Sequence, residues 1–226
     1  MKRWKPNDLR YIAFLDIMGF KDLVARRDHG YVEKVLTETS DIARYFTGEE
    51  VHEDGIVGIK SITFSDTILF VTSDDSPEVL RSLLGILCQF QASALQKTIP
   101  IKGALSYGRI TVNQSQSIYH GQPLIDAYEL QDQVHYYGIV LDNVIEARIF
   151  DLIEEGHLSL GILKNWIHKL PTPLKAGLIN HFNIRVHSLE DTTVQSLYNG
   201  CSGSTRKYVD NTVSIHNEMD NTISQK

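Results

Sequence analysis

The sequence predicts a single α+β domain of the ferredoxin-like type, in which a central, mostly antiparallel sheet is flanked by helices. Short apolar runs, typical of buried strands, alternate along the chain with longer segments of helical periodicity. One pair of strand-like runs, over residues 59–70, has the form of a β-hairpin. The resulting order of strand, helix, hairpin, helix and strand is that of a ferredoxin-like domain. Because unrelated activities share this fold, it does not identify the function.

The first half of the chain supplies a strand, a helical segment, the hairpin and a further helix. Residues 11–16 form an apolar run that ends in a glycine turn, and apolar residues then recur at helical spacing over 20–46. The hairpin turns at 64–66, where Phe-Ser-Asp separates its two strands. Ser76-Pro-Glu combines a capping residue with a proline at the first helical position, which predicts a helix that continues to about residue 97.

The next segment completes the expected core. Residues 99–118 predict a strand that turns near Gly108-Arg109 and is followed by a second short strand. A helix over 123–133, a strand over 138–141 and a helix from Asn143 come next. We therefore expect two helices and three strands after the helix that is predicted to end near residue 97.

Residues 1–150 are expected to form the core, and 151–226 to add accessory helix and strand elements and a C-terminal tail to the same domain. Trp166, Leu170 and the Pro171-Thr-Pro173 turn predict a small accessory helix and a loop, and residues 183–187 predict one more strand. The last segment is rich in Ser, Thr, Asn and Gly, with one amphipathic patch around 208–213. This composition predicts a partly ordered tail that ends in a short helix.

Composition narrows the class of protein. Acidic residues number 28 against 22 basic ones, a net charge of −6 that disfavours nucleic-acid and anionic membrane partners. The two cysteines, Cys88 and Cys201, are expected to be reduced, inert thiols. The N-terminus lacks the features of a signal peptide, and no stretch approaches the ~18 apolar residues of a membrane span. We expect a soluble, cytoplasmic protein.

Two aspartates are the main candidates for chemistry. Asp16 ends the first strand, before a glycine turn, and Asp66 lies at the hairpin tip, so both can project toward one point. Taken singly, each is equally well explained as a helix cap or turn residue. Together, two hard oxygen ligands beside a turn that offers backbone N–H groups suit Mg²⁺ or Mn²⁺ carrying a nucleoside triphosphate. The histidines show no spacing typical of a zinc site.

Four segments, in order, resemble a known family. Phe14-Leu-Asp-Ile-Met-Gly-Phe20 and Phe64-Ser-Asp-Thr-Ile68 resemble the two metal-binding strands of class III nucleotidyl cyclases. Pro100–Arg109 resembles the next core strand, and Tyr119–Leu130 the loop-to-helix element. The resemblance covers about residues 10–142 and is greatest to the small bacterial pyrimidine cyclases of anti-phage (Pycsar-type) signalling. No single segment is as specific as a Walker loop, and their order carries the argument.

The resemblance implies roles for residues of both metal-binding strands. Asp16 and Asp66 would be catalytic and would bind two divalent ions per active site, Mg²⁺ or Mn²⁺, with the backbone carbonyl of Ile17 as a further ligand. The turn Met18-Gly19-Phe20 would donate backbone hydrogen bonds to the β- and γ-phosphates, and Gly19 permits their close approach. The ribose 3′-hydroxyl would then attack the α-phosphorus in line and expel pyrophosphate.

The chain also departs from the purine cyclases. The two positions that read the adenine edge correspond to Ile62 and Ile118, which offer no hydrogen bond, and an unpaired buried polar edge costs about 1 kcal/mol or more. The Asn and Arg that stabilise the transition state correspond to Ile125 and Glu129. Adenine recognition of the usual kind is therefore not expected.

Three cations are candidates for contacts with the substrate. Pyrimidine cyclases place a cation, usually Arg, on the strand near Ala104, and this chain has Lys102 there, which keeps the charge but loses the bidentate fork. We expect Lys102 to bind substrate and assist catalysis; a solvated strand lysine is the alternative. Lys60 can reach a phosphate or base, or can be an exposed edge-strand lysine. Arg109 is expected to be solvated at its turn or to cross a dimer interface.

The resemblance implies a homodimeric phosphorus-oxygen lyase with active sites shared between protomers. It would convert UTP, or as a second choice CTP, to cyclic UMP or cyclic CMP, second messengers sensed by a separate effector protein in anti-phage defence. The alternatives are an adenylate cyclase and a catalytically silent cyclase-like domain that binds nucleotide and regulates a partner. The missing Asn and Arg favour a silent domain, whereas the two retained acids oppose it. A GGDEF-type synthase is disfavoured because its signature is absent from the hairpin.

Overall fold

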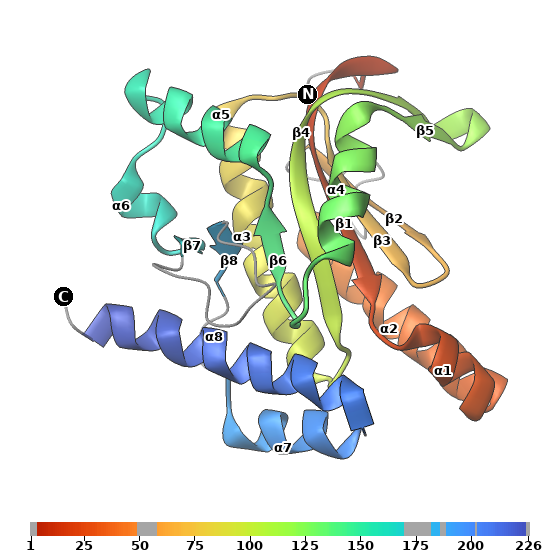
Figure 1. Ribbon diagram of the computed structural model, residues 1–226. Helices are drawn as coiled ribbons and strands as arrows, with labels where there is room; N and C mark the ends of the chain where they lie inside the picture. Colours follow the sequence, from red (N-terminus) through yellow and green to blue (C-terminus); the bar gives the residue numbers. More distant parts are fainter. Residues whose placement is uncertain (1–3, 49–57, 170–181, 186–188, 202, 225–226) are drawn as a thin grey trace.

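The computed structural model describes residues 4–48, 58–169, 182–185, 189–201 and 203–224, in which a mixed sheet carries helices on both faces (Figure 1). In the described part the sheet has eight strands in the order β2-β3-β1-β4-β6-β8-β7, with β5 paired to β4. The pairing of β4 with β6 is parallel and the others are antiparallel. The strands are β1 (Asn7–Ile17), β2 (Ile59–Phe64), β3 (Thr67–Thr72), β4 (Ile101–Asn113), β5 (Ile118–His120), β6 (Ile139–Leu141), β7 (Ile167–Lys169) and β8 (Phe182–Ile184).

The helices divide between the two faces of the sheet. Side chains of α2, α3 and α5 pack into the main core on one face, and α4 packs on the other face against β1 and β4. Within the described ranges, no helix combines the length and apolar character that a bilayer span requires. The helices are α1 (Phe20–Arg26), α2 (His29–Thr47), α3 (Pro77–Gln96), α4 (Gln122–Asp132), α5 (Asn143–Glu154), α6 (Leu160–Leu163), α7 (Asp191–Asn199) and α8 (Arg206–Ser224).

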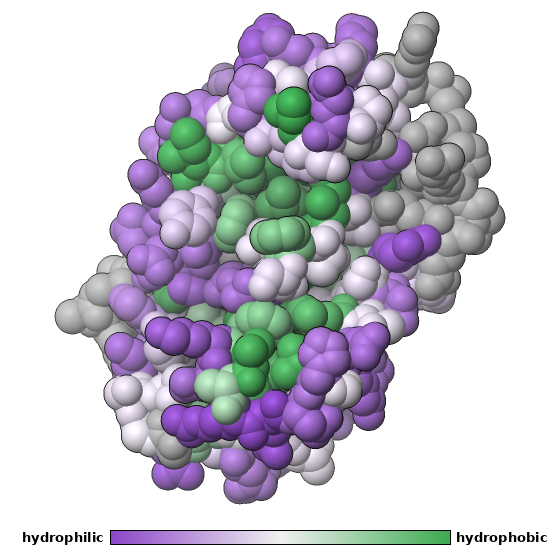
Figure 2. Space-filling model, turned by 90° about the vertical axis from the view of Figure 1, so that its right-hand side faces the viewer, coloured by the Kyte–Doolittle hydropathy of each residue, from purple (hydrophilic) through white to green (hydrophobic). Residues whose placement is uncertain are grey.

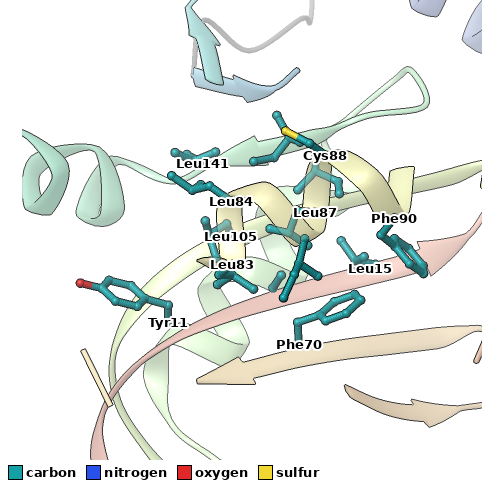
Figure 3. Close-up of a cluster of buried hydrophobic side chains, with 14 of the residues drawn as sticks. Tyr11, Leu15, Phe70, Leu83, Leu84, Leu87, Cys88, Phe90, Leu105 and Leu141 are labelled. Atoms are coloured by element: carbon teal, nitrogen blue, oxygen red, sulfur yellow. The ribbon is translucent and has the colours of Figure 1, made fainter. Parts of the chain in front are cut away.

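The predicted α+β class is confirmed, and so is the ferredoxin-like order. Strands β2, β3, β1 and β4 lie side by side, with the hairpin β2–β3 at one side of β1. The helical segment predicted over 20–46 forms α1 and α2, and the segment predicted from 76 to 97 forms α3. Helix α3 buries its apolar side chains against the strands, including Leu83, Leu84 and Leu87 (Figure 3).

Alternation along β1 separates the main core from the opposite face. Leu15 and Ile17 belong to the core beneath α3, whereas Ile12 and Phe14 belong to the cluster on the α4 side. Because side chains alternate along a strand, Asp16 projects to the same side as Phe14. The face that carries Asp16 is therefore the one on which α4 packs.

One predicted turn is wrong. Strand β4 continues through Gly108-Arg109, and the chain reverses only after Asn113, in a short 3₁₀ turn at 114–116. The reason is that β1 begins at Asn7, earlier than predicted, and so pairs with β4 beyond this point; Leu9 lies opposite Arg109. Arg109 is exposed, as expected, but within a strand.

The expectation of a partly ordered C-terminal tail is also wrong. Residues 191–199 and 206–224 form α7 and α8, and α8 lies across one end of the sheet (Figure 1). Its apolar pattern is weak because buried positions are polar: Asn211, Thr212 and His216 are all buried. Thr212 Oγ1 accepts the N–H of Tyr137 at 2.8 Å, and Asn211 Nδ2 donates to the carbonyl of His135 at 2.8 Å.

Other C-terminal predictions fare differently. A strand predicted near residue 183 is present as β8, whereas β7, which pairs with it, was not predicted. The small accessory helix expected around Trp166 is wrong, because residues 167–169 form β7 and the short α6 ends before it, at Leu163. The Pro171-Thr-Pro173 turn and residues 186–187 lie outside the described residues. Cys88 is buried and burial raises its pKa to about 12, which fits an inert thiol.

The hydroxyl of Thr212 is expected to contribute to stability through its bond to Tyr137. Thr212→Val keeps the shape but leaves a buried N–H without an acceptor, so we expect the free energy of unfolding to fall by about 1–3 kcal/mol. Thr39→Val is the matched control, because the buried Thr39 hydroxyl only donates to the Val35 carbonyl within α2. Urea unfolding should show a much smaller loss for this control; equal losses would show that the bond to α8 contributes nothing special.

Candidate functional site

The site is built around Asp16, near the end of the central strand β1. The antiparallel register places Asp16 opposite Thr67 on β3 and opposite Lys102 on β4. Directly opposed residues of an antiparallel pair have Cβ atoms about 4.5–5.5 Å apart. The half-buried carboxyl of Asp16 therefore lies between the hairpin and the cation of the neighbouring strand.

The second acid is brought to the first by the hairpin tip. Asp66 follows Ser65, which adopts a left-handed conformation with φ of 55°, and precedes β3. The carbonyl of Asp66 accepts the N–H of Ile17 at 3.0 Å, which ties the tip to the end of β1. The carboxyl groups lie near enough for the charge of Asp66 to raise the pKa of Asp16. The structure thus brings together the two acids singled out from the sequence.

The electrostatics of this pair favour a cation. Burial and the neighbouring charge of Asp66 raise the pKa of Asp16 to about 6, and Lys102 opposes that rise. Two adjacent carboxylates repel one another when both are ionised, and a divalent ion removes that repulsion. The donor set of Asp16 and Asp66 therefore fits Mg²⁺ or Mn²⁺.

The protein by itself supplies few ligands. No group of three or more His, Cys, Asp or Glu side chains that could hold a metal ion occurs in the part of the chain that the structure describes. The Ile17 side chain is buried in the core, so only its backbone can face the site. Magnesium sites built from one or two carboxylates usually take substrate phosphates and water as further ligands. The arrangement is thus suited to a metal that arrives with a phosphorylated substrate.

The glycine turn after β1 lies directly beside the acids. Gly19 has φ of 75° and a Cβ built on it would meet nothing within 4 Å, so open space lies over the turn. The N–H of Met18 donates to the carbonyl of Pro100 at 2.8 Å. Any phosphate contact from this turn therefore falls on the backbone of Gly19 and Phe20.

Lys102 is held within the site. Its side chain is only 7% exposed, and its Nζ lies 3.8 Å from Oδ1 of Asp132, whose side chain is 81% exposed. This burial contradicts the alternative of a solvated strand lysine. Asp132 is the last residue of α4 and was missed by the sequence argument. It lies seven residues, or two helical turns, after Ile125 on the same exposed face, and this spacing is the signal that could have identified it.

The structure does not bring every candidate to the acids. Lys60 is buried, and its Nζ lies 5.5 Å from the ring centroid of Trp4. It pairs with Val71, four residues along β3 from the level of Asp16, or roughly 13 Å at the usual rise of a strand. Ile62 lies opposite Leu69, in the apolar cluster on the α4 side. Ile118 lies on β5, at the far end of β4 from Lys102.

Apolar side chains surround the acid pair on this side of the molecule. Phe64 at the hairpin tip is 80% exposed, and Ile125 and Tyr128 on α4 are about half exposed. Phe14 packs edge-on against Tyr128, with ring centroids 5.4 Å apart. Figure 2, which faces the side of the molecule that lies to the right in Figure 1, shows apolar residues gathered across its middle. The sheet face around the acids is therefore an open, mainly apolar surface.

Sequence comparison finds no family profile that matches the chain, and no curated protein matches it. Many solved structures resemble its fold, among them the following three. The catalytic core of a rhodopsin-guanylyl cyclase with converted specificity, in complex with ATPαS, has 14% identity and a TM-score of 0.51, covering 80% of this chain and 97% of that one. A bacterial light-regulated adenylyl cyclase has 14% identity and a TM-score of 0.51, covering 80% of this chain and 91% of that one. An adenylate cyclase structure from Trypanosoma brucei, described as monomeric, has 9% identity and a TM-score of 0.52. It covers 80% of this chain and 90% of that one.

The fold is therefore that of class III cyclase catalytic domains, which confirms the fold prediction. At such low identity the comparison concerns the fold alone. Activity has to be argued from the acids, the turn and the cation.

The acid pair is expected to reduce stability at neutral pH. Because the folded state raises the pKa of Asp16 to about 6, ionisation of this carboxyl as the pH rises from about 4 to 6 removes stability. Asp16→Asn mimics the uncharged form. We therefore expect it to raise the free energy of unfolding at pH 7.5 by about 1 kcal/mol, after allowance for solvent screening. That gain corresponds to about 2–4 °C in Tm.

Thermal melts without divalent ions at pH 7.5 and pH 4 provide the test. The gain should vanish at pH 4, where Asp16 is already protonated. Asp151→Asn, at an exposed position on α5, removes the same charge elsewhere and serves as the control. A loss of stability in Asp16→Asn at both pH values would contradict the electrostatic account.

Proposed function

We propose that this chain is a class III pyrimidine nucleotide cyclase that converts UTP, or as a second choice CTP, to the 3′,5′-cyclic monophosphate and pyrophosphate. The observation that carries the proposal is the convergence of Asp16 and Asp66 beside Lys102 on the open face of the sheet. The fold is consistent with it, because cyclase catalytic domains share that fold. The four sequence segments that resemble these enzymes lie in the strands and helix that build the site.

The acids would hold the divalent ions. In this proposal Asp16 and Asp66, with the Ile17 carbonyl, bind two Mg²⁺ or Mn²⁺ together with the triphosphate. When bound, such ions supply positive charge that lowers the pKa of the ribose 3′-hydroxyl and neutralises the phosphates. Asp16 has to be ionised to act as a ligand, so activity is expected to fall as the pH drops through about 6.

The remaining groups would bind and orient the nucleotide. The N–H groups of Gly19 and Phe20 would donate to phosphate oxygens above the turn, where the space is open. Lys102 would add positive charge as the 3′-oxygen forms its bond to the α-phosphorus and the bond to pyrophosphate breaks. The 3′-hydroxyl proton passes to solvent. The apolar sheet face would pack against the base and exclude water.

The base preference rests on Ile62. It lies in the apolar cluster with Leu69 and offers no hydrogen bond to a purine edge. Ile118 contributes nothing to this argument within one protomer, since β5 lies far from the acids along β4. An apolar surface without hydrogen-bonding groups gives a purine no specific contact, and we therefore expect a pyrimidine base to be preferred.

We further propose a cytoplasmic homodimer whose product is a second messenger in anti-phage defence, read by a separate effector. Residues 1–150 would form the catalytic core and 151–226 an accessory part of the same domain. The exposed apolar side chains Phe64, Ile125 and Tyr128 support an interface on the open face. The acids and Lys102 both belong to one chain, however, so a partner would contribute other groups.

A silent nucleotide-binding domain remains the second candidate. The observation in its favour is that α4 exposes Ile125 and Glu129 where the purine cyclases carry the Asn and Arg of the transition state. The paired acids oppose it, because a silent domain has no chemical need for two carboxylates that destabilise one another.

The direct test is turnover with Mn²⁺ and each of the four ribonucleoside triphosphates, with products identified by mass spectrometry. We expect cyclic UMP to form fastest. Asp16→Asn and Asp66→Asn should each lower turnover by more than about 100-fold while thermal melts show a folded protein. Wild-type turnover in either variant would remove the metal-site assignment. ATP as the best substrate would refute the argument for a pyrimidine base, and binding without turnover would favour the silent domain.

A mixing experiment tests whether Lys102 acts within its own protomer. Active sites shared between protomers would allow Lys102 to act in the site of a partner, but the register places it opposite Asp16 of the same chain. Asp66→Asn mixed with Lys102→Ala should therefore show no activity above the parents, since each mixed dimer has two broken sites. Native mass spectrometry checks subunit exchange. Recovery toward about one quarter of wild-type activity would instead place Lys102 in the partner's site.

A further inference from the structure

Lys102 lies near two carboxylates, those of Asp16 and Asp132. Asp16 is its directly opposed neighbour across the β1–β4 ladder, and both side chains project from the same face of the sheet. The ion pair present in the structure is nevertheless with Asp132, at 3.8 Å between Nζ and Oδ1. Lys102 has a flexible four-carbon stem and nearly no contact with solvent, so its ammonium needs a carboxylate partner.

Asp132 is held in place although its carboxyl is exposed. It ends α4, and the chain that follows it is bonded to α8 through the carbonyl of His135 and the N–H of Tyr137. Val134 in the same segment is buried in the cluster that α8 shares with α4. The backbone of Asp132 is therefore held in place by α4 and α8, even though its side chain is exposed to solvent.

We propose that Asp132 is a positioning residue, which holds the ammonium of Lys102 on the α4 side of the acid pair and so keeps Asp16 and Asp66 open to a divalent cation. This role rests on the proposed function of that site. Without Asp132, the ammonium still faces Asp16, which lies directly opposite Lys102 on the ladder and whose pKa its charge already lowers. Lys102 would then occupy the acid pair as an internal counter-ion and compete with the metal.

The first arm of the test asks where Lys102 lies, and needs neither metal nor nucleotide. A water-soluble carbodiimide couples a lysine amine to a carboxylate in contact with it, and the linked peptides are identified by mass spectrometry. In the wild-type protein we expect the Lys102–Asp132 link. In Asp132→Asn we expect the link to move to Asp16 or Asp66. Absence of the Lys102–Asp132 link from the wild type would overturn the proposal.

The second arm measures Mn²⁺ affinity by calorimetry, without nucleotide. We expect Asp132→Asn to raise the Kd for Mn²⁺ by roughly threefold to tenfold, a typical coupling between contacting groups. Asp132→Glu should restore it. In the Lys102→Met background, Asp132→Asn should have no effect, because no ammonium is left to compete. An equal loss in both backgrounds would mean that Asp132 acts on the metal directly, and would overturn the positioning role.

Asp126→Asn is the matched control. It lies on the same helix, removes the same charge, and its carboxylate accepts from Gln122 Nε2 at 2.8 Å, so the amide keeps an acceptor. Its Kd for Mn²⁺ should stay at the wild-type value, and a rise like that of Asp132→Asn would overturn the proposal.

Turnover then separates the two claims. If the links and the Mn²⁺ coupling hold while the wild type converts no nucleotide, the proposed function fails and the positioning role stands. If the wild type is active while the links or the coupling fail, the positioning role is overturned and the cyclase stands. A wild type that binds Mn²⁺ neither alone nor together with inorganic triphosphate overturns both the metal pair and the positioning role.

Discussion

The antiparallel pairing of β1 with β4 is the interaction on which the rest of the molecule depends. The register runs without a break from Asn7 opposite Thr111 to Ile17 opposite Ile101. Along it, one set of side chains enters the core beneath α3 and the other faces α4. The same ladder places Asp16 next to Lys102, so a slip by one residue would bury the acid and expose the core at once. Fold and site are in this sense specified together.

The site works against the fold that carries it. Asp16 and Asp66 are brought together by the bond between Ile17 and the hairpin tip, and burial together with the charge of Asp66 disfavours the ionised form of Asp16. The sheet tolerates this because the neighbouring positions Ile12, Leu15 and Ile17 are almost fully buried. Local destabilisation of this kind is typical of functional sites.

Most of the core and the acid pair could be predicted from the sequence, because they follow from short-range patterns. The apolar run before Asp16, the hairpin around Asp66 and the Ser76-Pro start of α3 each carry a local signal. The parts that were missed depend on distant contacts. Helix α8 buries polar residues such as Thr212 whose partners lie far away in sequence, so its periodicity is weak. Asp132 shows its relation to Lys102 only once α4 is placed on the sheet.

The attachment of α8 has a consequence for the order in which the protein can mature. Thr212 and Asn211 bind the backbone of Tyr137 and His135, which lie 75 and 76 positions earlier in the sequence. These two residues belong to the segment that fixes the end of α4. During synthesis the strands emerge first, and α8 is made after all of them, so the sheet can form while the groups around Lys102 still lack their support. The two acids would thus be brought together before α8 fixes the position of the groups around Lys102. A chain cut ahead of α8 would leave Ala104 and Val140 without Ile215 and Met219, presenting apolar surface to chaperones and proteases.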